Sequence, residues 1–158
     1  MTQDDSRSYR GLLAALRLYL GVIFAIAAYG KLAHLAALPD MIGGFVNNVG
    51  LVRAPEFFKE FLSGVVVPHL KAFAMLTVAG ETFVALSMLT GTVVRLGGVV
   101  ALFLLTNYML TKGMWWWDPA SNDGAQSVIA AVVVVGAAGR AFGIDAYLAA
   151  RWPNGWFW

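Results

Sequence analysis

The segment from Pro68 to Gly91 constrains the fold most strongly, because it is apolar almost throughout and still carries a carboxylate, Glu81, near its middle. Pro68 and Glu81 are separated by about 20 Å of helix, at about 1.5 Å per residue. The hydrocarbon core of a bilayer is about 30 Å thick, so Glu81 lies at middle depth if this segment crosses a membrane. A carboxyl group there costs on the order of a few kcal/mol, and it normally faces the protein interior and has a partner or a function.

The composition indicates a membrane protein. The chain has 158 residues, of which 59% are hydrophobic and 13% are charged, whereas a soluble domain is about half apolar and about a quarter charged. A formal net charge of +2 without a basic run gives no indication of a nucleic-acid partner. The absence of cysteine excludes thiolate metal sites and thiol–disulfide chemistry carried by this chain itself.

Four apolar segments predict an all-α integral membrane four-helix bundle with short interfacial helices, built as one domain. The predicted spans are residues 11–31, 68–91, 93–112 and 124–143. The connection over 32–67 is rich in Gly and Pro, which break regular structure, and it holds an amphipathic helix at about 56–62. Asp123 and Gln126 have the spacing of a capping box at the start of the last span. Ala25-Ile26-Ala27 would also fit a signal-peptide cleavage site, but the apolar segment continues beyond it, so we expect a retained first helix.

The distribution of basic residues predicts the orientation of the bundle. An even number of spans places both termini on one side of the membrane. That side carries six basic residues: Arg7, Arg10, Arg17, Arg95, Arg140 and Arg151. The other side carries five: Lys31, Arg53, Lys59, Lys71 and Lys112. This slight excess favours cytoplasmic termini by the positive-inside rule.

Arg17, inside the first predicted span, is the candidate partner of Glu81. Counted from the same membrane surface, the two residues differ in depth by about 6 Å, which an extended arginine side chain covers. Opposite charges buried in lipid pair because each alone is costly, so we expect a buried ion pair between them. Two alternatives stay open. In the first, Arg17 extends to the headgroups and Glu81 is protonated and bonded to Thr77; in the second, Glu81 handles protons.

Three further polar residues are candidates for lining a quinone site: Asn107, Tyr108 and His69. The competing interpretation is that Asn107 bonds to a neighbouring helix and that His69 meets the headgroups. No residues have the spacing of a metal site. The chain also has no phosphate loop, dinucleotide fingerprint, H-E-x-x-H or G-x-S-x-G, so it shows no self-contained catalytic motif and the catalytic residues are unknown.

Two groups of tryptophans predict anchors at the membrane–water interface, where Trp is favoured. They are Trp115, Trp116 and Trp117 in the loop before the last span, and Trp152, Trp156 and Trp158 near the end of the sequence. A stacking surface for an aromatic ligand is the alternative for the first group.

The order of several short motifs carries a family resemblance. Arg17 and Gly21 form R-x-x-x-G, G-K-L follows at 30–32, Glu81 lies in a run that ends in Gly, and G-x-x-x-G-I-D closes the pattern at 139–145. This order resembles the DoxX family of small four-helix bacterial membrane proteins, over about residues 12–148.

The resemblance implies a multi-pass protein of the bacterial inner (cytoplasmic) membrane. Its best-known relatives are linked to quinone-coupled thiosulfate oxidation and to membrane-bound oxidative-stress complexes, so quinone is the implied cofactor. The family's polar positions correspond to Arg17, Lys31, Glu81 and Asp145. The long first connection and the aromatic C-terminal region depart from the family pattern and favour contacts with other proteins or lipids.

Two hypotheses of function follow. The leading one is a membrane subunit of a quinone-linked redox or electron-transfer complex, with the lipid bilayer and other membrane subunits as partners and no nucleic acid. The alternative is a structural or assembly subunit of a larger membrane complex, with no ligand chemistry of its own.

Overall fold

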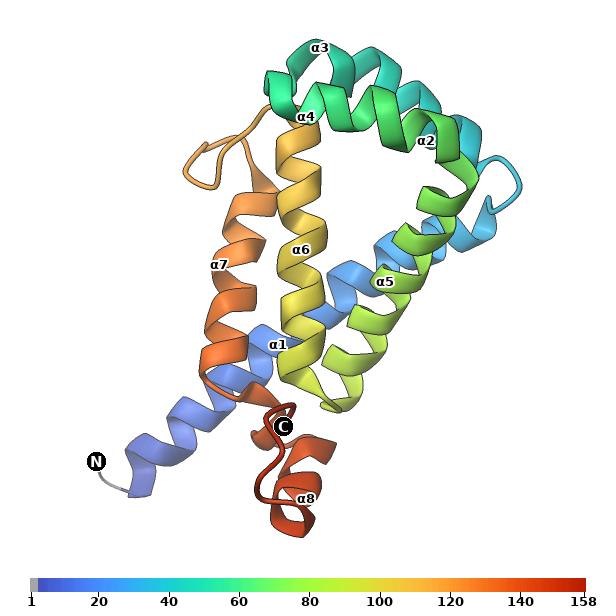
Figure 1. Cartoon of the computed structure of the whole chain (residues 1–158). Coiled ribbons are helices and arrows are strands. Elements are labelled where there is room, and N and C mark those ends of the chain that lie inside the picture. The colour runs from blue at the N-terminus through green and yellow to red at the C-terminus, as the bar shows by residue number, and fades with distance from the viewer. Residues whose placement is uncertain (1–2) are drawn as a thin grey trace.

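Four long helices enclose one apolar core in the computed structural model, which describes residues 3–158, with side chains from residue 7 onward (Figure 1). They are α1 (Gln3–Ala33), α5 (Leu70–Thr90), α6 (Val94–Lys112) and α7 (Asn122–Val135). Helix α1 packs against α5 and α7, and α6 packs against the same two helices. The core between them is made of buried aliphatic and aromatic side chains. No strand occurs in the described part of the chain, and the predicted all-α membrane helical bundle is confirmed.

Three helical segments of the described chain are long and apolar enough to cross a membrane: Arg7–Ala33, Glu56–Thr90 and Val94–Lys112. The protein is therefore a multi-pass membrane protein. Helix α7 is apolar but has 14 residues, which is about 21 Å of helix and less than the thickness of a hydrocarbon core. A fourth crossing, completed by α7, stays a prediction.

The connection between α1 and α5 is largely helical, in contrast to the irregular structure predicted for most of it. Its elements are α2 (Leu38–Phe45), η1 (Val46–Gly50), α3 (Leu51–Arg53), α4 (Glu56–Phe61), η2 (Leu62–Val66) and η3 (Val67–His69). These elements lie across one end of the bundle, which we call the connection end (Figure 1). They have their own core, in which Val46, Phe58 and Leu62 are buried. That burial holds the segment in helices despite its glycines.

The opposite end, which we call the terminal end, contains the start of α1, the turn between α5 and α6, η4 (Ala138–Arg140) and α8 (Ile144–Arg151) (Figure 1). Helix α7 stops at Val135 instead of continuing to 143. Gly136 ends it, and Ala137 then takes a left-handed conformation with φ of 46°. A left-handed residue just beyond a helix is a common stop.

The start of α7 also differs from the capping box predicted at Asp123 and Gln126. The N-cap is Ser121, whose Oγ accepts a hydrogen bond of 3.2 Å from the Gly124 N–H. Asp123 instead accepts a hydrogen bond of 2.6 Å from Lys112 at the end of α6. This ion pair ties α6 to α7 next to the tryptophan loop.

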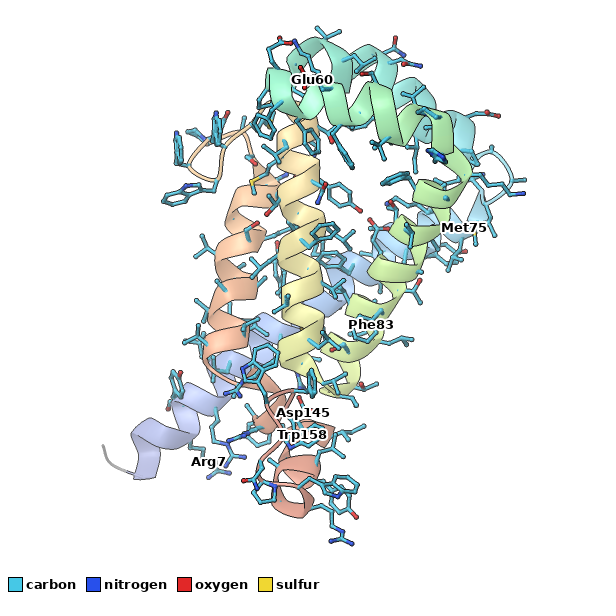
Figure 2. All side chains as sticks on the ribbon, in the orientation of Figure 1. Arg7, Glu60, Met75, Phe83, Asp145 and Trp158 are labelled. Atoms are coloured by element: carbon cyan, nitrogen blue, oxygen red, sulfur yellow. The ribbon has the colours of Figure 1, made fainter. Side chains whose placement is uncertain are left out.

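The two tryptophan groups lie at opposite ends of the molecule. The loop with Trp115, Trp116 and Trp117 is at the connection end, where Gly113 lies against the backbone of Arg53. Its three indoles are exposed, and those of Trp115 and Trp117 stack at 5.5 Å. The second group, Trp152, Trp156 and Trp158, is at the terminal end (Figure 2). Two aromatic belts are typical of a protein that spans a bilayer, and the anchoring role stays a prediction.

Candidate functional site: a buried carboxylate held by two other helices

Glu81 of α5 is buried, with 1% of its surface exposed. The Lys31 ammonium of α1 donates to both of its carboxylate oxygens at 2.8 Å. The Tyr108 hydroxyl of α6 donates to Oε1 at 2.6 Å. Three helices thus contribute one group each to a compact hydrogen-bonded cluster. Such charge-assisted bonds are about twice as strong as bonds between neutral groups, and they offset part of the cost of burying the carboxylate.

The geometry of antiparallel helices explains why Lys31 and Glu81 meet. In a helix every Cα–Cβ bond leans toward the N-terminus. Helices α1 and α5 run in opposite directions, so the Lys31 side chain leans back into the bundle while the Glu81 side chain leans toward the connection end. The two side chains approach each other from different levels.

The predicted ion pair between Arg17 and Glu81 is wrong. Arg17 is buried, but its guanidinium lies against Gly91 and Gly143 at the terminal end. Gly91 is ten positions from Glu81 along α5, about 15 Å of helix. The predicted depth of Arg17 depended on a first helix that begins at Gly11, whereas α1 begins at Gln3. The Arg17 side chain also leans away from Glu81, by the same rule that brings Lys31 toward it.

Arg17 belongs to a second buried cluster, at the turn between α5 and α6. Gly91 is the C-cap of α5, where the negative end of the helix dipole favours a cation. The charge of Arg17 interacts with that of Asp145, which is also buried. The Nε and Nη1 groups of Arg17 have no hydrogen-bond partner among the described residues. This cluster joins α1, the α5–α6 turn and the start of α8.

Asp145 caps α6 across 51 residues of sequence. Its carboxylate oxygens accept from the Val93 N–H at 2.6 Å and the Val94 N–H at 2.9 Å. Burial raises the pKa of the Asp145 carboxyl above its ordinary value, and the two backbone N–H groups and the nearby charges of Arg17 and Arg140 offset part of that effect. Figure 2 shows Asp145 at the terminal end.

The three candidates for a quinone site lie in different surroundings. Tyr108 bonds directly to Glu81. Asn107 is partly exposed, and its side-chain amide donates to the Phe103 carbonyl at 2.7 Å, within its own helix. The His69 ring is 2.9 Å from the Val65 carbonyl and is exposed. It borders a shallow, mostly apolar pocket on the outer surface, lined by residues 68–72 and 75. The structure therefore brings Tyr108, and neither of the other two, into contact with Glu81.

Lys31 is the site residue that reasoning from depth and charge missed. The resemblance names it among the polar family positions but gives it no partner. The lean of side chains along antiparallel helices is the signal that favours it over Arg17. The described residues contain no group of three or more His, Cys, Asp or Glu side chains placed to hold a metal ion.

Fold and site together define the class: a small all-α multi-pass membrane protein with a charged cluster buried between its helices. The profile of a family described as "TQO small subunit DoxD" matches residues 12–156. The chain belongs to this DoxD family, which confirms the resemblance to DoxX-type proteins. No curated protein and no solved structure matches the chain significantly.

Proposed function

We propose that this protein is the membrane subunit of a quinone-linked redox complex and that Glu81 exchanges a proton there. The observation that carries the proposal is the cluster of Glu81 with Lys31 and Tyr108, which are joined by hydrogen bonds of 2.6 to 2.8 Å in the interior of the bundle. Membership in a family described as the small subunit of TQO supports the redox assignment. Ionisable groups inside a membrane bundle commonly mark proton relays.

The donor set of the cluster suits the carbonyl oxygen of a quinone. An ammonium group has three N–H donors, and two of those on Lys31 are directed at Glu81. The third is available for an acceptor, and the Lys31 side chain is 27% exposed. A bound quinone would supply the electron-accepting chemistry. The carboxyl group of Glu81 holds or releases a proton, and Lys31 and Tyr108 fix its position.

The alternative is an assembly subunit in which the same cluster is only structural. A buried ion pair is weak evidence of function, because removing one partner destabilises a protein whatever the pair does. The test must therefore separate assembly from turnover.

The experiment compares Glu81→Gln with Glu56→Gln in the complex purified from native membranes. Glu56 is a control because its carboxylate also accepts a hydrogen bond of 2.8 Å from a lysine, Lys59, but is exposed on α4, outside the site. We expect Glu81→Gln to assemble normally and to lower thiosulfate-dependent reduction of a short-chain quinone at least about a hundredfold, the lower end of the range for loss of a general acid–base group. Thiosulfate is the first donor to test because the family resemblance implies it. Unchanged turnover in Glu81→Gln would favour the assembly subunit.

A further inference from the structure

The polar groups around Glu81 continue toward one end of the molecule. Lys31 is partly exposed on the side of the connection end. Tyr108 lies one helical turn before Lys112 on α6, and Lys112 in turn bonds to Asp123 of α7. The Lys112–Asp123 pair, bonded at 2.6 Å, is partly exposed beside the tryptophan loop. Ionisable groups thus extend from Glu81 to the surface at the connection end.

The opposite direction is closed by an apolar layer, one to two turns thick. At the level between Glu81 and Arg17, most buried side chains of three helices are apolar. They include Leu20 and Phe24 of α1, Val84 and Met88 of α5, and Ala101 and Leu105 of α6, each at most 3% exposed. A buried polar group at this level is Ser87, and its hydroxyl already donates to the Thr92 carbonyl at 2.8 Å. Among the described residues, these apolar side chains offer water or a proton no polar partner, so crossing the layer is costly.

We infer that Glu81 exchanges its proton with the connection end alone and is sealed from the terminal end. The inference rests on the proposed proton exchange at Glu81 and adds its direction. A proton released from the Glu81 carboxyl passes to water at the connection end, and one taken up arrives from there. If the termini are cytoplasmic, as the arginine distribution predicts, the exchange takes place on the outer side.

The charged and titratable groups between this carboxyl and the connection end come from three helices. Lys31 of α1 and Tyr108 of α6 contact it directly. Lys112 of α6 and Asp123 of α7, which pair with each other, lie beyond Tyr108 toward the connection end. Arg17 and Asp145 lie beyond the apolar layer and interact with each other. A pH change at the connection end therefore reaches Glu81 through Lys31 and Tyr108.

The test uses liposomes in which the inner and outer pH are set independently. Dicyclohexylcarbodiimide reacts with protonated carboxyl groups in an apolar environment, and mass spectrometry measures the adduct on the peptide that contains Glu81. The chain has no cysteine, so His34→Cys at the connection end and Tyr147→Cys at the terminal end report the orientation by reaction with an impermeant maleimide. Both positions are exposed. Glu81→Gln gives the background.

We expect labelling of Glu81 to rise as the pH at the connection end is lowered, by up to about tenfold per pH unit, the limit for uptake of one proton. Labelling should not change with the pH at the terminal end. Glu56→Gln, at an exposed carboxylate of α4 outside this route, should keep this one-sided response. Labelling that follows the terminal end, follows both ends equally, or responds to neither would overturn the inference. The readout needs no redox turnover. One-sided labelling with unchanged turnover in Glu81→Gln would therefore refute the proposed function and leave the sidedness intact.

Discussion

Lys31 of α1 and Glu81 of α5 are joined by two hydrogen bonds of 2.8 Å, although 50 residues separate them in the sequence. Their side chains come from antiparallel helices and lean toward each other. This pair is an ion pair between the two helices, and its carboxylate is almost completely buried. The stability of the bundle should depend on it.

Removing one member of the pair should destabilise the protein. We expect Lys31→Leu alone to lower the free energy of unfolding by about 3 kcal/mol, because it leaves the buried Glu81 charge without its partner. Glu81→Leu alone should cost less, because the Lys31 side chain that it leaves unpaired is partly exposed. The double variant should recover most of that loss, since an apolar pair buries well. Thermal unfolding in detergent measures all three. A double variant that loses the sum of the single effects would show that the two residues act independently.

The Tyr108 hydroxyl should contribute less than the ion pair. Tyr108→Phe removes a single hydrogen bond of 2.6 Å to the carboxylate, and such a bond to a charged group is worth about 1.5–3 kcal/mol. Tyr29→Phe is the control, because Tyr29 is 74% exposed. This variant should have the same free energy of unfolding as the wild type. Equal stability of Tyr108→Phe and the wild type would mean that the hydroxyl does not hold Glu81.

Gly91 should not tolerate a side chain. Its φ is 72°, which disfavours other residues, and an added Cβ would occupy the place of the Arg17 guanidinium. We expect Gly91→Ala to cost more than about 2 kcal/mol. Gly30→Ala is the control, because nothing lies near that position and alanine favours a helix by up to about 1 kcal/mol. Similar unfolding temperatures for the two variants would contradict the packing of Arg17 against the turn.

Asp145 should make stability depend on pH in an unusual direction for an aspartate. Burial raises its pKa in the folded state above the ordinary value of 3.8. At a pH between the pKa of the unfolded state and that of the folded state, the folded state therefore binds more protons than the unfolded state. Stability from this group is therefore fully present below the unfolded pKa and is lost as the pH rises through the folded pKa. The stability difference between the wild type and Asp145→Asn should shrink as the pH rises from about 4 toward neutrality. A difference that grows with pH would show that the N–H donors and Arg17 outweigh burial.

The sequence is sufficient to predict the class of fold, but it does not show which charged side chains pair between the helices. Long apolar segments predict membrane helices, because hydropathy over about 20 residues is a strong signal. Whether Glu81 pairs with Arg17 or Lys31 depends on where α1 begins and how it is set against α5. That register is fixed where Gly21 packs against Leu89, a contact between residues far apart in the sequence.

The buried cluster of Arg17 and Asp145 also depends on contacts between residues far apart in the sequence, which local patterns do not show. Asp145 lies in the first turn of its own short helix, α8, but its side chain caps α6. A local pattern cannot show this, because the bond depends on how the end of the chain folds back over the α5–α6 turn. The early stop of α7 is equally non-local, since η4 and α8 must turn there to bring Asp145 to the turn. Side-chain lean, by contrast, is a general property of helices, and it favours Lys31 over Arg17 wherever two neighbouring helices are antiparallel in this way.

The most direct test of the proposed function is to purify this protein from its native membranes in mild detergent and to identify its companions by native mass spectrometry. We predict a complex in which this chain is bound to at least one further subunit and which reduces a short-chain quinone. A chain that is recovered alone, with phospholipid and without quinone-reducing activity, would contradict the assignment as a subunit of a redox complex.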